Sequence, residues 1–242
     1  MYKKMIKALV VVGLVALSLG SVPALAEEDS LSVSADVGVF SQYVWRGYAL
    51  SDDSLIVQPS LTFAYGGFGL NFWGNYDSDY YDTGSDYNET DITLSYDWSF
   101  DSVSMGLGYI YYDVDGGETS EVYYTVGFDT ILAPSITIYR DIDAFEGWYI
   151  NLGIGHSIPV ADDLSLDLAA SIGYYDVDDG DYSELHDGSI SASMTFAVTD
   201  KFSITPSLAY TFGLSSDAKD ALEDADGDSA HFVGGITGSY SF

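Results

Sequence analysis

Apolar and polar residues alternate along most of the chain with a period of two, which is typical of β-strands that have one apolar face. The last stretch, residues 231–242, is the clearest example, because Phe232, Ile236 and Tyr240 alternate there with small or polar residues. The same pattern predicts twelve strands, which cover approximately residues 31–46, 55–65, 68–76, 90–98, 103–112, 121–129, 134–140, 148–158, 164–175, 189–198, 202–212 and 231–242.

The connections between these strands fall into two kinds. Those after the even-numbered strands are short, at residues 66–67, 100–102, 130–133, 159–163 and 199–201. Those after the odd-numbered strands are mostly longer and rich in Asp, Gly, Ser and Tyr, at residues 47–54, 77–89, 113–120, 141–147, 176–188 and 213–230. Short turns at one end, longer loops at the other and an even strand count predict an all-β fold, a transmembrane antiparallel β-barrel of twelve strands. A soluble β-sandwich is the alternative, but it has no reason to segregate its loops in this way.

The N-terminus has the pattern of a cleaved signal peptide. Lys3, Lys4 and Lys7 precede an apolar run at residues 8–17, and Ala-Leu-Ala at residues 24–26 provides a small-residue cleavage site. We therefore expect residues 1–26 to be removed, and residues 27–242 to form a single barrel domain in the outer membrane. In this arrangement the chain crosses the membrane many times and both termini are periplasmic.

The end of the chain carries a second export feature. Tyr240 and the terminal Phe242 resemble the C-terminal signature of bacterial outer-membrane β-barrels, which the barrel-assembly machinery reads. The expected partners are this machinery during biogenesis, and outer-membrane lipid and lipopolysaccharide afterwards. A homo-oligomer is left open.

The charge of the chain excludes one large class of partner. All 38 acidic residues follow the predicted leader, together with only four basic residues, Arg46, Arg140, Lys201 and Lys219. Such a chain has no basic stripe that could neutralise phosphates, so we expect no binding of nucleic acid. The sequence has no cysteine, so backbone pairing and packing must hold the exported protein together.

The interior of the predicted barrel should contain water and acidic groups. If the apolar faces contact lipid, the opposite faces of the last five strands carry mainly Ser, Thr and Gly, which leaves space in a twelve-stranded barrel. The charged residues expected to line the pore are Asp36, Arg46, Asp91, Asp97, Glu121, Asp129 and Asp167. This excess of carboxylates predicts a small diffusion pore that prefers cations. Arg46 is the single inward base, and its candidate partners are Asp52, Asp91 and Glu121.

The acidic loops suggest a second chemistry. Several have the spacing of oxygen ligands for Ca²⁺ or Mg²⁺, namely Asp113, Asp115 and Glu118, then Asp176 and Asp178, and finally Asp224, Asp226 and Asp228. None completes the twelve-residue EF-hand pattern, so solvated acidic loops are the favoured interpretation. The alternative function is a non-conducting barrel whose outer loops bind divalent cations, lipopolysaccharide or a surface partner.

Catalysis and cofactors are not expected. The chain has three histidines, His156, His186 and His231, and no obvious nucleophile motif accompanies any of them. We predict that the protein is not an enzyme and binds no cofactor.

One motif resembles a known family. Ser41-Gln42-Tyr43-Val44-Trp45-Arg46-Gly47, followed by Ser51-Asp52, is similar to the S-x-Y-x-[FW]-R-G stretch near the N-terminus of the TorF-like proteins of proteobacteria, which are described as porins. The resemblance implies an outer-membrane barrel and a porin. Within the motif, the resemblance points to Arg46 as the functional residue of this chain. By the alternation of the first strand, Arg46 is expected at the outer end of that strand, pointing into the lumen.

Overall fold

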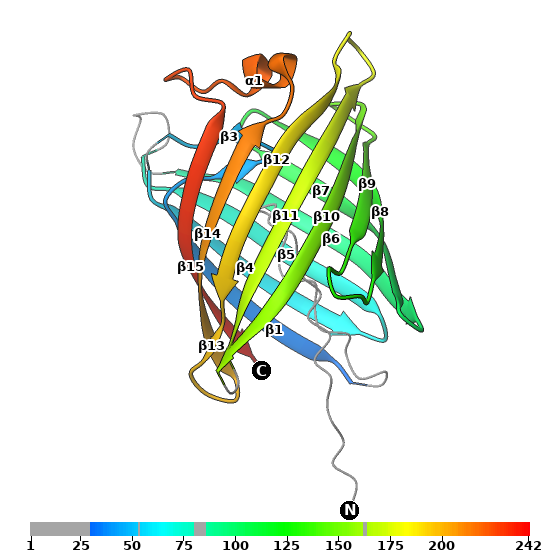
Figure 1. Cartoon of the computed structure of the whole chain (residues 1–242), viewed down its shortest axis with the longest axis vertical. Coiled ribbons are helices and arrows are strands. Elements are labelled where there is room, and N and C mark those ends of the chain that lie inside the picture. Colours follow the sequence, from blue (N-terminus) through cyan, green and yellow to red (C-terminus); the bar gives the residue numbers. More distant parts are fainter. Residues whose placement is uncertain (1–29, 53, 80–85, 162–163) are drawn as a thin grey trace, which may run out of the picture.

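The computed structural model describes residues 30–52, 54–79, 86–161 and 164–242, and it confirms the predicted barrel. Twelve antiparallel strands form one sheet that closes on itself, and both the C-terminus and the start of β1 lie at the lower end in Figure 1. The wall strands are β1 (Ser32–Phe40), β4 (Ile56–Tyr65), β5 (Phe68–Asp77), β6 (Asp86–Phe100), β7 (Val103–Val114), β8 (Gly117–Phe128), β9 (Ser135–Asp141), β10 (Gly147–Ala161), β11 (Leu164–Val177), β12 (Ser183–Met194), β14 (Phe202–Gly213) and β15 (Ala230–Ser241).

Each wall strand pairs with its neighbours in the chain, and two further pairings close the ring. The first strand β1 pairs with the last strand β15. β12 pairs directly with β14, and the short strand β13 (Phe196–Ala197) continues this pairing with β14 beyond the end of β12. A closed sheet has no edge strand, so every wall strand finds backbone partners on both sides.

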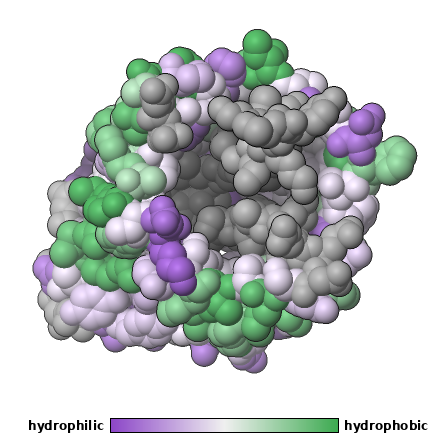
Figure 2. Space-filling model, turned by 90° about the horizontal axis from the view of Figure 1, so that it is seen from below, coloured by the Kyte–Doolittle hydropathy of each residue, from purple (hydrophilic) through white to green (hydrophobic). Residues whose placement is uncertain are grey.

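The period of two in the sequence becomes two faces of the wall. Along β15, Phe232 is 63% exposed whereas the next residue, Val233, is 2% exposed. Large apolar side chains such as Leu94, Leu152 and Ile236 are also exposed on the outside of the wall. Seen from its lower end, the wall surrounds a central hollow and carries apolar residues around its outer rim (Figure 2). This outward apolar surface is what a barrel presents to lipid.

The two ends of the barrel differ as predicted, with two corrections. The predicted loop at residues 113–120 is a tight hairpin, because β7 and β8 remain paired up to Val114 and Gly117. Gly116, with φ +95°, supplies the left-handed backbone that such a turn requires. The predicted strand at residues 189–198 begins earlier, at Ser183, and is interrupted before β13. Residues 162–163, which are part of the predicted short turn at residues 159–163, lie outside the described residues.

The longest upper loop contains a helix. This helix, α1 (Ser216–Leu222), begins at Ser215, whose hydroxyl accepts a hydrogen bond from the backbone N–H of Ala218 at 3.0 Å. That contact is the usual N-cap interaction of serine. Among the described residues, no helix is long and apolar enough to cross a membrane.

Phe242→Ala is expected to impair assembly more than stability. The Phe242 side chain is 70% exposed, and its ring contacts Tyr240 at a centroid distance of 5.0 Å. Loss of an exposed side chain changes the free energy of unfolding by about 0.5 kcal/mol or less. We therefore expect less protein in the outer membrane, while barrels that do assemble keep the wild-type melting temperature.

The matched control is Phe100→Ala, because Phe100 is equally exposed at the end of β6 but is not terminal. Quantitative immunoblots of outer-membrane fractions measure assembly, and the loss of heat-modifiable electrophoretic mobility measures stability. Wild-type membrane levels of Phe242→Ala would contradict the assembly-signal prediction.

Candidate functional site

The first upper loop does not extend away from the barrel but folds into it. The predicted first strand, residues 31–46, ends at Phe40, and the following residues form a small hairpin of β2 (Val44–Trp45) and β3 (Tyr48–Ala49). Two hydrogen bonds close its base. The backbone N–H of Tyr43 donates to the Ser51 hydroxyl at 2.8 Å, and that of Leu50 donates to the Tyr43 carbonyl at 2.8 Å.

The tip of this hairpin is the Arg46-Gly47 pair. Arg46 has φ +48° and Gly47 has φ +85°, so both central residues of the turn are left-handed, as a type I′ turn requires. Glycine adopts this conformation freely, but arginine does not, and the left-handed region costs a non-glycine residue roughly 1–2 kcal/mol. Contacts of the Arg46 side chain must compensate for this cost.

Those contacts form an aromatic and acidic cage around the Arg46 guanidinium. Its two terminal nitrogens donate to the two carboxylate oxygens of Glu121, each at 2.7 Å, and the two side chains are only 4% and 3% exposed. The guanidinium carbon also lies 4.3 Å from the ring centroid of Trp45, 4.6 Å from that of Tyr139 and 4.3 Å from that of Tyr149. A bidentate ion pair combined with cation–π contacts is the strongest form of arginine recognition available to side chains. The prediction that Arg46 pairs with a rim acid is confirmed for Glu121.

The hairpin crosses the lumen to reach this cage. It leaves the wall at β1, whereas Glu121 belongs to β8, which is the fifth strand from β1 in one direction and the seventh in the other. Tyr139 and Tyr149 lie on the adjacent strands β9 and β10. The hairpin therefore spans the barrel almost across its diameter and narrows the bore at its upper end.

The helix of the last loop covers the tip of the hairpin. Leu222 and Ala218 of α1 are buried, and a Cβ atom added at Gly47 would lie 2.8 Å from Cδ1 of Leu222 and 3.1 Å from Cβ of Asp187. Glycine is therefore required at position 47 for two reasons, its backbone conformation and the close approach of α1 and β12.

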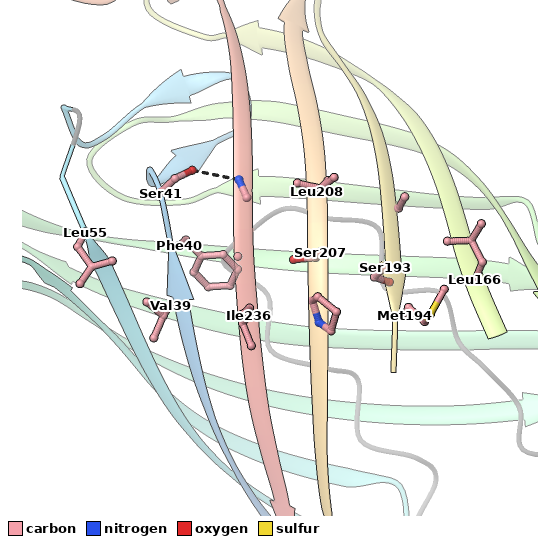
Figure 3. Close-up of a pocket in the computed structure, with 14 residues that line it drawn as sticks. Val39, Phe40, Ser41, Leu55, Leu166, Ser193, Met194, Ser207, Leu208 and Ile236 are labelled. Carbon is pink, nitrogen blue, oxygen red and sulfur yellow. Dashed lines mark hydrogen bonds between the residues drawn. The ribbon is translucent and has the colours of Figure 1, made fainter. Parts of the chain in front are cut away.

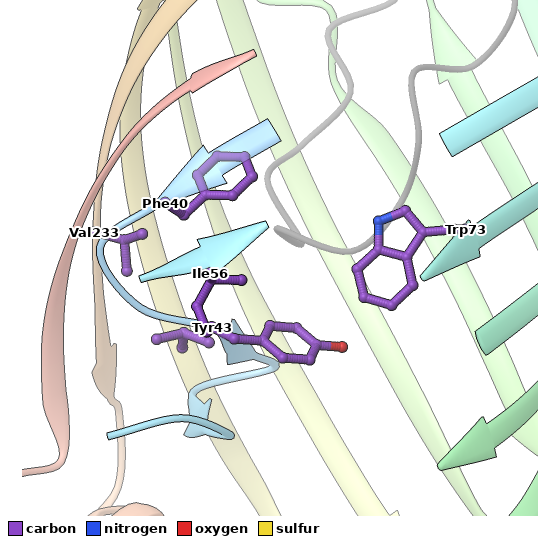
Figure 4. Close-up of a cluster of buried hydrophobic side chains, with 6 residues drawn as sticks. Phe40, Tyr43, Ile56, Trp73 and Val233 are labelled. Atoms are coloured by element: carbon purple, nitrogen blue, oxygen red, sulfur yellow. The ribbon is translucent and has the colours of Figure 1, made fainter. Parts of the chain in front are cut away.

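An apolar cluster supports the base of the hairpin. Tyr43 and Val44 pack with Phe40, Ile56, Trp73 and Val233 (Figure 4), and the rings of Tyr43 and Trp73 are tilted by 55° at a centroid distance of 5.8 Å. These wall residues lie on the inner face of β1, β4, β5 and β15. These bulky inner side chains thus form the support on which the hairpin rests.

Buried carboxylates surround the hairpin. They come from β5, β6, β8, β9 and β12, and they are Asp77, Glu89, Asp91, Glu121, Asp141 and Asp187. Four of them have hydroxyl partners: Glu121 accepts from Tyr112 at 2.9 Å, Asp141 from Thr119 at 2.8 Å, Asp187 from Tyr149 at 2.9 Å, and Glu89 from Tyr43. Within the upper lumen of the described chain, Arg46 is the base that faces these acids.

Two of these six carboxylates, Asp91 and Glu121, were predicted from the sequence to line the pore. The other four were assigned to loops, because the neighbouring stretches of sequence are rich in Asp, Gly, Ser and Tyr. The missed signal was the continuing alternation, since Asp77 follows Trp73 and Asn75 on the inner face of β5, and Glu89 precedes Asp91 on that of β6.

The remaining predicted pore residues lie lower in the barrel. Asp36, Asp97 and Asp167 belong to β1, β6 and β11, and each is half-buried on the inner face. Asp129, by contrast, lies in the turn after β8 and is exposed, so its placement in the wall was wrong. One residue beyond the last paired position of β8, the backbone N–H of Asp129 donates to the Ser102 carbonyl of the neighbouring turn at 2.8 Å.

Comparison with known proteins places this barrel in a family. A model of bacterial proteins of unknown function, called Gcw_chp, matches residues 25–221, which include the hairpin and every wall strand except β15. The chain belongs to the Gcw_chp family. This match does not confirm the resemblance to the TorF-like family. No curated protein matches the chain.

Solved structures agree with the fold of this Gcw_chp barrel. A structure described as the NanC porin aligns with a TM-score of 0.58 at 12% identity, over 87% of this chain and 100% of that chain. A second structure, from a study of in-meso crystallization of membrane proteins, aligns with a TM-score of 0.51 at 9% identity, over 87% of this chain and 84% of that chain. At these identities the likeness shows the fold alone, a β-barrel of the outer-membrane porin type.

The acidic loop residues of the Gcw_chp barrel have other partners. Asp178 accepts a bidentate pair of hydrogen bonds from Arg140, at 2.9 and 2.6 Å, and these bonds hold its pKa below the usual value. Asp224 accepts the backbone N–H groups of Asp226 and Asp228 at 3.0 and 2.8 Å. Among the described residues, no three His, Asp or Glu side chains form a group that could hold a metal ion. The predicted loop metal sites therefore remain a prediction without geometric support.

The three histidines lie in different parts of the Gcw_chp barrel. His156 Nδ1 lies 2.7 Å from the Ile131 carbonyl oxygen near the lower end. His186 is buried on β12 beside the hydroxyl of Tyr182, and His231 Nδ1 lies 3.7 Å from the Asp224 carboxylate. The structure thus brings no two of them together.

An apolar groove of about 680 Å³ lies on β1, β12, β14 and β15 (Figure 3). Val39, Leu208 and Ile236 border it and are exposed, while Gly234 and Pro206 contribute little side-chain volume. These residues share the lipid-facing parity of their strands. The groove therefore belongs to the outer surface of the Gcw_chp barrel and not to the bore.

Proposed function

We propose that the protein is a porin-like channel for passive diffusion of small solutes through the outer membrane, with a preference for cations. The observation that carries this proposal is the excess of acidic groups in the described lumen, where six buried carboxyl groups and the half-buried Asp36, Asp97 and Asp167 accompany one arginine. A low-dielectric wall focuses this negative potential, which attracts cations and repels anions. The inner faces of β10 to β15, which carry mainly small residues such as Gly153, Ser191 and Thr237, offer the path past the hairpin.

The hairpin defines the second candidate function. Because it spans the lumen beneath α1, it also suits a non-conducting barrel whose acidic outer loops bind divalent cations, lipopolysaccharide or a surface partner. Planar-bilayer recording of the refolded protein separates the two functions. A channel gives discrete conductance steps and a cation-directed reversal potential, whereas a plugged barrel gives no steps.

The selectivity for cations over anions is expected to fall in the double variant Asp36→Asn/Asp167→Asn. Both carboxylates face the lumen below the hairpin, and one oxygen of each has no hydrogen-bond partner among the described residues. No described basic side chain neutralises these two carboxylates, so their removal should shift the reversal potential in a salt gradient toward zero. The shift should be largest at low ionic strength, because salt screens charges over about 10 Å at 0.1 M.

The matched control for selectivity is Asp101→Asn/Asp129→Asn. It removes the same charge from exposed turn residues at the lower end of the barrel. The control should leave the reversal potential nearly unchanged. An equal shift in both double variants would mean that overall charge, and not the wall acids, sets selectivity.

Orientation is the last part of the proposal. We expect the upper loops to face the cell exterior and both termini the periplasm. The chain has no native cysteine, so single cysteines report position without background. Asp181→Cys, in the loop between β11 and β12, should react with a membrane-impermeant maleimide on intact cells, and Ser102→Cys, in the lower turn after β6, should not. Labelling of Ser102→Cys alone would reverse the orientation.

A further inference from the structure

The carboxylates beside the hairpin are not balanced by Arg46. Glu89 and Asp91 lie on β6, and both Glu89 and Glu121 are within electrostatic reach of Asp91. Arg46 commits both of its terminal nitrogens to Glu121. Glu89 and Asp91 are therefore two further acidic groups in this buried region, and no second basic side chain of the described upper lumen pairs with them.

One carboxylate oxygen of Asp91 lacks a partner among the described residues. Asp91 is 4% exposed, and the oxygen without a hydrogen-bond partner is its Oδ1 atom. A buried carboxylate in this state is costly unless a cation or a donor satisfies it. Its neighbour Glu89 receives a hydrogen bond from the side chain of Tyr43. Of the three neighbouring acids Glu89, Asp91 and Glu121, Asp91 is therefore the one with an oxygen available for a ligand.

Aromatic rings flank Asp91 on both sides. In the sheet its direct neighbours are Trp73 on β5 and Tyr112 on β7, and side chains at directly opposed positions lie about 4.5–5.5 Å apart at Cβ. The hairpin adds Tyr43 and Trp45. The ring centroid of Tyr43 lies 5.8 Å from that of Trp73, and the ring centroid of Trp45 lies 6.3 Å from that of Tyr112. We call these six residues, Tyr43, Trp45, Trp73, Glu89, Asp91 and Tyr112, the Asp91 cluster.

This combination of carboxylates and ring faces selects one kind of ligand. Organic cations bind ring faces through cation–π contacts and carboxylates through charged hydrogen bonds. The chain already shows this chemistry in the neighbouring cage, where the Arg46 guanidinium lies over three rings and pairs with Glu121. A metal ion would instead need several oxygen ligands, and within the described residues no such group is formed.

We propose that the Asp91 cluster is a binding site for a small organic cation that carries a primary amine or a guanidinium group. The ammonium or guanidinium donates to Asp91 and Glu89, and its carbon chain lies against Trp73 and Tyr112. Tyr43 and Trp45 belong to the hairpin, so the ligand enters by displacing these two side chains rather than a wall strand. As a step in permeation the site rests on the proposed channel function, but binding can be measured without conduction.

The experiment is isothermal titration of agmatine into the refolded mature barrel in detergent, at constant ionic strength. We expect saturable binding of one agmatine per barrel and no binding of butylurea, a neutral analogue. Asp91→Asn should weaken agmatine binding by about tenfold or more, because a hydrogen bond to a charged group contributes about 1.5–3 kcal/mol. Trp73→Leu should weaken it as well, because it removes a ring face but no charge.

The matched control is Asp97→Asn, which makes the same change on the same face of β6. Asp97 lies lower on the strand and accepts a hydrogen bond from Ser95 at 3.2 Å. Its variant should bind agmatine with wild-type affinity. Heat-modifiable electrophoretic mobility establishes that each variant is folded before titration.

The outcomes separate this inference from the channel proposal. Conducting barrels that bind no agmatine, or that lose binding equally in Asp91→Asn and Asp97→Asn, would overturn the site. Mg²⁺ binding that depends on Asp91, with no binding of agmatine, would overturn it in favour of a metal. Agmatine binding that depends on Asp91 in a barrel without conductance steps would support the site and overturn the channel.

Discussion

Replacement of Arg46 by alanine is expected to release the hairpin from the far wall and to raise the conductance of the barrel. In the variant, Glu121 would stay buried beneath the hairpin without its cation, and loss of one partner of a buried ion pair costs about 3–5 kcal/mol. Movement of the hairpin out of the lumen lets water reach Glu121 and removes this cost. The ratio of undocked to docked hairpin should therefore rise by about two to four orders of magnitude. Single-channel recording measures the result as a larger unit conductance.

Arg140→Ala provides the control for this prediction. Arg140 forms the second bidentate ion pair of the chain, with Asp178, but this pair lies outside the lumen and is partly exposed. An exposed pair contributes about 1 kcal/mol or less. Conductance should therefore be unchanged in Arg140→Ala, and a similar increase in both variants would show that the effect is not due to the hairpin.

A second variant tests the same release by a different measurement. In the folded wild-type barrel Arg46 is buried, so trypsin should not cleave after it. Glu121→Gln leaves Arg46 without its charged partner, and the undocked hairpin should become a substrate for cleavage between Arg46 and Gly47. Resistance of this variant to trypsin, together with wild-type conductance, would mean that the aromatic rings alone hold the hairpin.

The barrel could be predicted from the sequence because its main determinants are local. Alternation along strands such as β10, and short turns such as Gly66-Gly67, depend on neighbouring residues and are visible in one dimension. The errors occurred where tertiary contacts override this pattern. Residues 41–46 continue the alternation of the first strand, yet the chain leaves the sheet after Phe40, and Tyr43 and Val44 become buried in the apolar cluster inside the barrel.

The site was predicted only in part, for a related reason. Alternation placed Arg46 in the lumen, which is correct, but on a strand rather than at the tip of a hairpin. No local pattern shows that Arg46 meets Glu121, 75 positions later in the chain. The role of Tyr139 and Tyr149 in the cage could not be predicted for the same reason. In the sequence both are ordinary inward-facing strand residues, and only the folded hairpin brings Arg46 to their rings.

Gly47→Ala is expected to disturb the same constriction from its upper side. Alanine at φ +85° carries a backbone penalty of roughly 1–2 kcal/mol. Its Cβ would also lie 2.8 Å from Leu222 and 3.1 Å from Asp187, so either α1 or the hairpin must move. Gly116→Ala is the matched control, because Gly116 has φ +95° and a Cβ there meets no atom within 4 Å. Both variants share the backbone penalty, but only Gly47→Ala should change the unit conductance in planar bilayers. If the two variants conduct alike, the contact between α1 and the hairpin does not control the bore.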